Sequence, residues 1–231
     1  MNVTDISAED IGAALNVLHK HCPRTIGRFL ESETTISNVE VTDVRDGFYE
    51  WTASEDVQHH VVSVLEIFSR GNPTIIQNCC VDNTDRRKKK ILIVVDDSLG
   101  NTVADIGGYF KSHSSAIDDF RILSIHVSSK CKDTDSVLRV IDAAIGLRMS
   151  QSDLFIVIGG GTLMDIIGFA AAIYKGGIRY VRIPTTLVGM IDAGVGVKVG
   201  VNFGDHKSII RRYFAPIACL NDPVTFLVML S

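Results

Sequence analysis

Short apolar runs that alternate with helix-like segments constrain the fold of this chain more than any other feature. The runs ILIVV, FRILSIHV and LFIVI begin at residues 91, 120 and 154, and segment 134–148 predicts a helix between the last two. Strands that alternate with helices need crossover connections, which place helices on both faces of a parallel sheet. We therefore predict an α/β fold in which helices flank a Rossmann-like parallel sheet.

The first part of the chain has a different pattern. Residues 7–20, SAEDIGAALNVLHK, combine a capping-box signal with apolar residues at helical spacing and predict a helix. Aromatic and β-branched residues predict strands at 48–54 and 59–68. We divide the chain into an N-terminal helical extension at 1–47 and an α/β domain at 48–231.

The composition argues against several classes of function. The formal net charge of −4 lacks the basic surplus of a general nucleic-acid-binding protein, and the basic run at 86–90 is predicted to be a solvated loop. Five cysteines without CxxC spacing indicate reduced thiols. The acidic N-terminal residues do not resemble a signal peptide, and no uncharged apolar run reaches the roughly 18 residues of a membrane span. We expect a soluble, cytoplasmic protein that binds neither nucleic acid nor membranes.

Three consecutive glycines follow the apolar run at 154–158 and lead into an almost wholly apolar segment. They are Gly159, Gly160 and Gly161. Ligands of doubly wound sheets bind outside the carboxyl ends of the strands. Glycines let the backbone approach a ligand closely and take left-handed angles, and the N-terminus of the next helix offers free N–H groups. The pattern predicts a pyrophosphate site, although Met164 stands where GxGxxG has its last glycine. The alternative is a tight turn in which Asp165 complements the helix dipole.

Segment 178–207 carries a second group of candidate site residues. Thr185 and Thr186 end a predicted strand with two hydroxyls that are suited to hydrogen bonds with a ligand. A carboxylate and two ammonium groups follow in a glycine-rich setting, and they could hold hydroxyls and a phosphate; they belong to Asp192, Lys198 and Lys207. A solvated hairpin with incidental charges explains the same pattern equally well.

The motifs GGGTLMD, RYVRIPTTL and DAGVGVKVGVN, in this order, closely resemble the sugar phosphate cyclase family, whose best-known member is 3-dehydroquinate synthase. The resemblance is continuous from about residue 153 to 226 and weaker from residue 48 onward. The motif DAGVGVK, in place of the DSSVGGK of dehydroquinate synthases, looks like the 2-epi-5-epi-valiolone synthase branch. That branch cyclises sedoheptulose 7-phosphate with elimination of phosphate.

The resemblance implies a set of ligands and residue roles. It implies a bound NAD, a divalent metal (zinc or cobalt), a sugar phosphate substrate and the N-terminal domain of the dehydroquinate synthase-like fold; a homodimer is compatible with it. Gly159, Gly160 and Gly161 would cradle the pyrophosphate, and Asp96 would bind the adenosine ribose. Asp165, Thr185 and Thr186 would line the cofactor. Asp192, Lys198 and Lys207 would face the nicotinamide and the substrate.

The chain also departs from the family pattern. Gly176 replaces a substrate-binding arginine of dehydroquinate synthases. Ser98 and Ser208 each stand where the family has an asparagine, and Arg211 stands where it has a glycine. The metal ligands of the family lie in a helical C-terminal domain, whereas beyond Lys207 this chain has one acidic residue and no histidine. We therefore expect no metal ligands here, a C-terminal domain that is absent, and a chain that is inactive alone.

Three other functions remain open. One is 3-dehydroquinate synthase activity. A second is an iron-type alcohol dehydrogenase, which shares the fold and a similar layout of glycines and threonines, although LVGMIDAGVGVK does not resemble that class. The third, of a different kind, is a non-catalytic nucleotide-binding protein.

Overall fold

The chain divides into two compact units in the computed structural model. They comprise residues 1–57 and 58–231, and each is described by itself. The structure describes residues 38–45, 48–54, 59–77, 87–128 and 131–223. The predicted helix at 7–20 lies outside these ranges.

The first unit contains an antiparallel hairpin. Strand β1 (Asn38–Arg45) pairs with β2 (Phe48–Ser54), and the register is irregular between Asp43 and Arg45. The predicted strand at 48–54 is confirmed. The boundary that we expected at residue 48 falls inside this hairpin, because β2 pairs with β1 and so belongs with the first unit.

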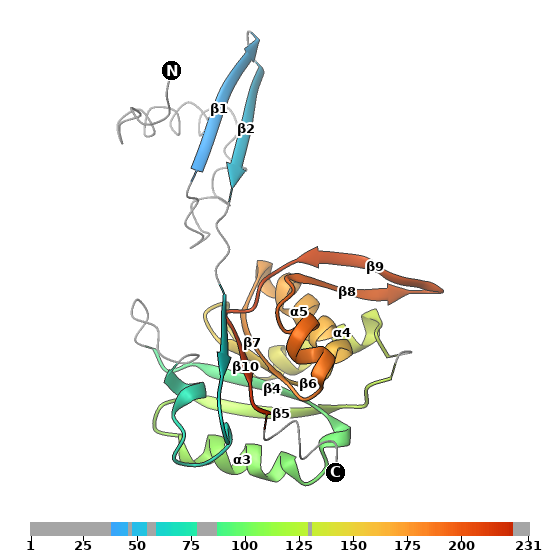
Figure 1. Cartoon of the computed structure of the whole chain (residues 1–231). Helices are drawn as coiled ribbons and strands as arrows, with labels where there is room; N and C mark the ends of the chain where they lie inside the picture. The colour runs from blue at the N-terminus through green and yellow to red at the C-terminus, as the bar shows by residue number, and fades with distance from the viewer. Residues whose placement is uncertain (1–37, 46–47, 55–58, 78–86, 129–130, 224–231) are drawn as a thin grey trace. The chain divides into compact units, whose positions relative to one another are not determined.

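The second unit is built on a six-stranded parallel sheet of order β3-β10-β7-β6-β4-β5 (Figure 1). The three apolar runs at 91, 120 and 154 form neighbouring strands of this sheet. The predicted α/β class and parallel sheet are confirmed. The strands are β3 (His60–Ser63), β4 (Lys90–Asp96), β5 (Asp119–Ile125), β6 (Leu154–Gly159), β7 (Arg179–Pro184) and β10 (Ala218–Asn221).

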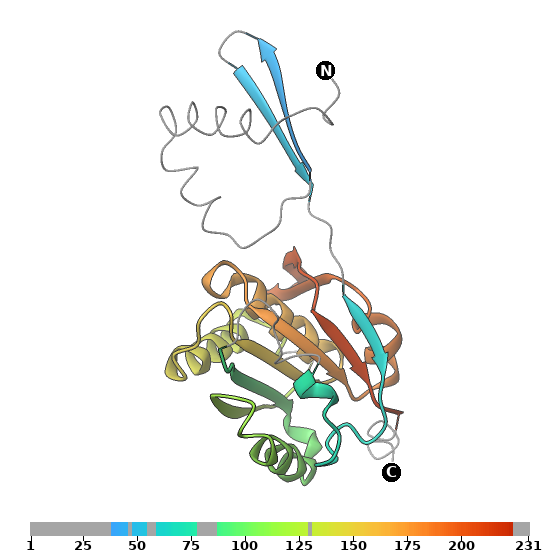
Figure 2. The same ribbon diagram turned by 90° about the vertical axis from the view of Figure 1, so that its left-hand side faces the viewer.

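Helices cover both faces of this sheet (Figures 1 and 2). Helix α3 (Thr102–Ser112) packs on one face, and α4 (Thr134–Gly146) and α5 (Gly161–Ile173) pack on the other. Successive side chains of a strand point to opposite faces, so Ile91 and Ile93 pack with the α3 layer and Leu92 packs with the α4–α5 layer. The continuous apolar runs in β4 and β6 result from this two-sided burial.

A second hairpin lies over α5. Strands β8 (Lys198–Phe203) and β9 (His206–Tyr213) pair antiparallel, and Val199 and Val201 of β8 are buried in the α4–α5 layer. Sequence analysis gave a solvated hairpin as the alternative interpretation of segment 178–207, and the structure confirms that a hairpin begins in this segment. No helix among the described residues is long and apolar enough to cross a membrane.

Two local predictions differ from the structure. The strand predicted at 59–68 ends at Ser63, because the Asp222 carboxylate accepts a hydrogen bond from the Ile67 amide at 2.9 Å and holds a turn there. The basic run was expected to be solvated, but Lys89 is 1% exposed and Lys90 begins β4. This end of the run is drawn into the sheet because the Lys89 carbonyl accepts from the Asp118 amide at 3.0 Å.

Candidate functional site

Three neighbouring strands end at the same edge of the sheet. The register pairs Val95 of β4 with Ile158 of β6, and Gly159 with Pro184 of β7. The residues that follow these strands therefore meet, and the Thr185 amide donates to the Gly159 carbonyl at 3.0 Å. This edge is where an open parallel sheet binds its ligands. The structure gathers there all of the predicted cofactor-binding residues except Asp165, which lies further along α5; they are Asp96, Gly159, Gly160, Gly161, Thr185 and Thr186.

The N-terminus of α5 opens onto this edge without a side-chain cap. Gly160 is the N-cap residue, no side chain bonds to the first turn, and that turn contains no acidic residue. The first N–H groups of a helix lack partners within the helix, and its dipole makes this end positive. An anion at Gly160 would satisfy both features.

The glycines are not needed here for left-handed backbone angles, and that expectation is wrong. None of the three has a positive φ, and Gly160 is extended with φ −83° and ψ 177°. A Cβ placed on Gly160 would meet Cγ2 of Thr186 at 3.4 Å, which is ordinary contact. Because the protein leaves room for a side chain at Gly160, close approach of a ligand is the remaining reason for a glycine.

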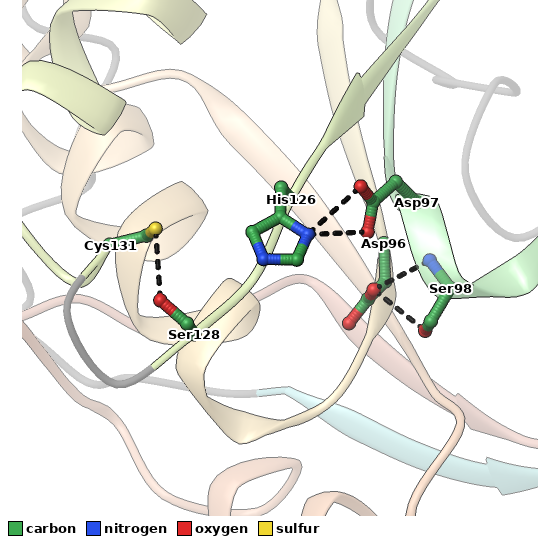
Figure 3. Close-up of polar contacts among 6 residues, drawn as sticks. All are labelled: Asp96, Asp97, Ser98, His126, Ser128 and Cys131. Carbon is green, nitrogen blue, oxygen red and sulfur yellow. Dashed lines mark hydrogen bonds and ion pairs between the residues drawn. The ribbon is translucent and has the colours of Figure 1, made fainter.

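Asp96 ends β4 beside this helix. Its Oδ1 accepts hydrogen bonds from the amide of Ser98 at 3.0 Å and from the Ser98 hydroxyl at 2.7 Å (Figure 3). Oδ2 makes no hydrogen bond within the described part of the chain, so one carboxylate oxygen is available for a ligand hydroxyl. Nearby, Nδ1 of His126 lies 3.1 Å from Oδ2 of Asp97 in an exposed pair (Figure 3). The two hydrogen bonds from Ser98 fix the orientation of the Asp96 carboxylate.

The two threonines occupy different environments. Thr185 is 5% exposed, whereas Thr186 is exposed beside Gly160. The Thr186 hydroxyl accepts from the Gly189 amide at 3.1 Å and keeps its own proton to donate. Of the two predicted cofactor contacts, Thr186 is the one whose side chain is open to a ligand.

Asp165 lies in the second turn of α5 and pairs with a residue that the sequence did not single out. Its Oδ2 is 2.5 Å from Nζ of Lys132, and the same ammonium donates to Oγ of Ser208 at 3.0 Å. Lys132 lies in the connection after β5, which ends at the same edge. No local pattern of the sequence singles out Lys132, because its partners lie on α5 and β9.

The three predicted catalytic residues are exposed and do not form one cluster. Asp192 lies in the π-helical turn η5 (Gly189–Ala193), Lys198 is the first residue of β8, and Lys207 is the second residue of β9. The two lysines stand near opposite ends of the hairpin. None of the three forms an ion pair with any described residue.

The Asp192 turn nevertheless lies beside the glycine motif. A Cβ on Gly161 would be 3.2 Å from Cβ of Ala193, the neighbour of Asp192. Among the departures from the family pattern, Ser208 lies within β9 with φ +47°, and Gly176 has φ +86°. The described residues contain no group of three His, Cys, Asp or Glu side chains that could hold a metal.

Comparison with a family model decides the relationship. Residues 122–231 match the model described as 3-dehydroquinate synthase N-terminal. This segment is similar to the N-terminal domain of 3-dehydroquinate synthases. The resemblance drawn from the GGGTLMD, RYVRIPTTL and DAGVGVK motifs is confirmed.

Two relatives each match nearly three quarters of this chain. A 2-epi-5-epi-valiolone synthase of Actinomyces sp. is 33% identical over 171 residues, which is 74% of this chain and 44% of the relative. A 3-dehydroquinate synthase of Synechococcus sp. (strain CC9605) is 30% identical over 173 residues, 72% of this chain and 46% of the relative. The chain therefore spans less than half the length of these relatives.

Solved structures show the same relationship. The 2-epi-5-epi-valiolone synthase from Streptomyces hygroscopicus subsp. jinggangensis 5008, with NAD+ and Zn2+ bound, has a TM-score of 0.66 and 32% identity, covering 75% of this chain and 45% of that structure. An iron-containing alcohol dehydrogenase from Thermotoga maritima has a TM-score of 0.54 at 16% identity, covering 73% and 47%. The latter is similar in fold alone.

Proposed function

We propose that this chain belongs to the 3-dehydroquinate synthase-like family and forms the NAD-binding part of a sugar phosphate cyclase that acts like a 2-epi-5-epi-valiolone synthase. The proposed substrate is sedoheptulose 7-phosphate, and the proposed reaction class is a phosphate-eliminating lyase. The observation that carries the proposal is the uncapped N-terminus of α5 at Gly160. Asp96 stands on one side of it and Thr186 on the other, as a dinucleotide site requires.

NAD fits the residues at this edge. The first N–H groups of α5 would hold the pyrophosphate, and the free oxygen of Asp96 would accept from an adenosine ribose hydroxyl. Thr186 would donate its proton to the cofactor. Bound there, NAD would accept and return a hydride. The chain would hold the cofactor in position and surround it with charged side chains.

The residues that we propose to face the substrate are Asp192, Lys198 and Lys207, with the two lysines near opposite ends of the β8–β9 hairpin. An ammonium attracts a sugar phosphate and stabilises the negative charge that grows as phosphate leaves. A carboxylate near the sugar can accept a hydroxyl proton. Their exposure leaves all three side chains accessible to a ligand.

The metal of such enzymes has no ligand set within the described residues. Polarising a ring hydroxyl needs a metal held by several protein ligands. We therefore expect the 231-residue chain alone, given NAD+ and zinc or cobalt, to release no phosphate from sedoheptulose 7-phosphate. Steady multiple turnover would contradict this expectation.

The alternative functions can be separated by activity. Turnover of the 3-dehydroquinate synthase substrate in place of sedoheptulose 7-phosphate would favour 3-dehydroquinate synthase, a relative at 30% identity. NAD-linked oxidation of simple alcohols would favour an alcohol dehydrogenase, for which similarity of fold is the support. NAD+ binding without turnover by a chain that includes the metal-binding part would favour a non-catalytic nucleotide-binding protein.

Calorimetric titration of the 231-residue chain with NAD+ tests the proposal directly. We expect saturable binding that Gly160→Val abolishes while the circular dichroism spectrum stays unchanged. Gly71→Val is the matched control, because a Cβ at Gly71 meets no atom within 4 Å. Unchanged NAD+ affinity in a folded Gly160→Val variant would refute the site.

A further inference from the structure

An arginine is buried in the middle of a central strand. Arg182 of β7 is 1% exposed, and it lies between Val157 of β6 and Cys219 of β10. No carboxylate among the described residues pairs with it, and its Nε has no hydrogen-bond partner. Burial of a cation without a counter-ion is costly, so packing alone does not explain the residue.

The guanidinium is held by backbone carbonyls of the loop that follows η5. Its Nη1 donates to the carbonyl oxygens of Ala193 and Gly196, each at 2.5 Å, and lies 3.4 Å from that of Gly194. Carbonyls at the end of a helical turn carry partial negative charge and need donors. Arg182 supplies donors to three such groups from the side of the sheet.

The residue that these bonds position is the neighbour of Ala193. The carbonyl of Asp192 accepts from the amides of Val195 at 3.1 Å and Gly196 at 2.9 Å, which closes the loop around Arg182. The Asp192 side chain itself is exposed. Hydrogen bonds therefore fix the backbone of Asp192, whereas its side chain stays exposed to solvent.

The same guanidinium is connected to the start of β8 through Tyr180 and Phe214. Its Nη2 donates to the Tyr180 hydroxyl at 2.7 Å, and that hydroxyl donates to the Phe214 carbonyl at 2.9 Å. The Phe214 amide in turn donates to the carbonyl of Val197 at 2.7 Å, and Val197 precedes Lys198. The Tyr180 and Phe214 rings stack with centroids 5.8 Å apart.

We propose that Arg182 is a positioning residue for the substrate site. It holds the backbones of Asp192 and Lys198 so that both side chains face one ligand. The proposal rests on the proposed function for the roles of Asp192 and Lys198. A guanidinium suits this task because its rigid fork reaches the loop carbonyls and the Tyr180 hydroxyl at once. A lysine at position 182 would keep the positive charge, but its single ammonium could not bond to the loop carbonyls and the Tyr180 hydroxyl at the same time.

The first test measures the loop itself and does not depend on the proposed function. Amide hydrogen exchange is compared in the wild-type chain, Arg182→Met and Arg182→Lys, with Arg139→Met on the exposed face of α4 as control. We expect exchange in 189–198 to rise about tenfold or more in both Arg182 variants, while β4, β6 and α5 keep their protection. Unchanged exchange in 189–198 would overturn the proposal.

The second test separates positioning from a merely structural role. Affinities for NAD+, and for sedoheptulose 7-phosphate in the presence of NAD+, are measured in a cycle of Arg182→Lys, Asp192→Asn and the double variant. We expect NAD+ affinity within about twofold of wild type and about tenfold weaker sugar phosphate binding in each single variant. The double variant should be weaker than Asp192→Asn alone by clearly less than the full effect of Arg182→Lys, because only the part that acts through Lys198 remains.

Several outcomes would decide against the proposal. Additive losses in the double variant, or equal losses of NAD+ and sugar phosphate affinity, would reduce Arg182 to a structural residue. Arg182→Lys keeps the charge, so it serves if Arg182→Met fails to fold. A wild-type chain that binds neither ligand would refute the proposed function, and the exchange experiment would still decide whether Arg182 holds the loop.

Discussion

The ammonium of Lys132 bridges Asp165 on α5 and Ser208 on β9, with Nζ 2.5 Å from the Asp165 carboxylate. This contact ties the connection after β5 to the hairpin that carries Lys207. The Asn202 amide also donates to the Lys132 carbonyl at 2.7 Å, so backbone and side chain of one residue both hold the hairpin. The side chains of Lys132 and Asp165 are 18% and 27% exposed, so the pair is largely shielded from water.

Removal of the Lys132 ammonium should therefore destabilise the fold. We expect Lys132→Met to lower the free energy of unfolding by about 1–2 kcal/mol, because it leaves a partly buried carboxylate unpaired. Urea denaturation measures the loss, and Lys132→Arg should recover part of it. Lys88→Met, at an exposed lysine, should change stability by less than about 0.5 kcal/mol. Equal effects of Lys132→Met and Lys88→Met would show that the bridge contributes nothing.

The Asp96 carboxylate should select NAD+ over NADP+. A 2′-phosphate at the ribose would meet the negative charges of Asp96 and Asp97, whereas a hydroxyl can donate to Asp96. We expect Asp96→Ala to weaken NAD+ binding by about tenfold and to reduce the discrimination against NADP+. Calorimetric titration with both dinucleotides checks this, with the exposed Asp142→Ala on α4 as control. Retained preference for NAD+ in Asp96→Ala would place the ribose elsewhere.

Stability should fall at alkaline pH because two buried acids hold their protons. Burial raises the pKa of the Tyr180 hydroxyl from 10.0 to about 12 and that of the Cys219 thiol from 9.0 to about 11. A group whose pKa is raised by folding stabilises the protein below its ordinary pKa and loses this contribution as pH rises toward the folded value. The loss should begin near pH 9 and reach roughly 2–3 kcal/mol for Tyr180 by pH 12.

Urea denaturation at pH 8, 10 and 11.5 measures this decline. Tyr180→Phe should be less stable at pH 8, because the Phe214 carbonyl loses its donor, but should lose less on going to pH 11.5. A decline of the same size in wild type and Tyr180→Phe would assign the pH dependence to other groups.

A side chain at Gly194 should be poorly tolerated. Its Cβ would lie 2.5 Å from the Gly189 carbonyl oxygen and 2.8 Å from Sγ of Cys219. The Gly189 oxygen cannot move away freely, since it accepts from the Gly194 amide at 2.6 Å. We expect Gly194→Ala to cost about 3 kcal/mol in thermal or urea unfolding. Gly196→Ala, whose Cβ would be 3.5 Å from the Asp192 carbonyl oxygen, should cost less than about 1 kcal/mol. Similar costs at both positions would refute the assigned clash.

Much of the fold could be predicted from the sequence because the signals are local. The runs at 91–95 and 154–158 are apolar at every position, which only strands buried on both faces need. Gly159, Gly160 and Gly161 directly follow such a strand and precede a helix, so chain order alone brought them to the ligand-binding edge. Asp96 and Thr186 could be placed there for the same reason, since parallel strands end together.

Tertiary structure alone decided which partners these residues have. Lys132 and Asp165 lie on different elements, and no local pattern records that the β5–α4 connection folds against α5 and β9. Arg182 looked like an ordinary strand residue, because only the loop that folds back over β7 brings the carbonyls of Ala193 and Gly196 to its guanidinium. Periodicity along a chain reports which face is buried, whereas hydrogen-bond partners depend on where distant segments come to lie.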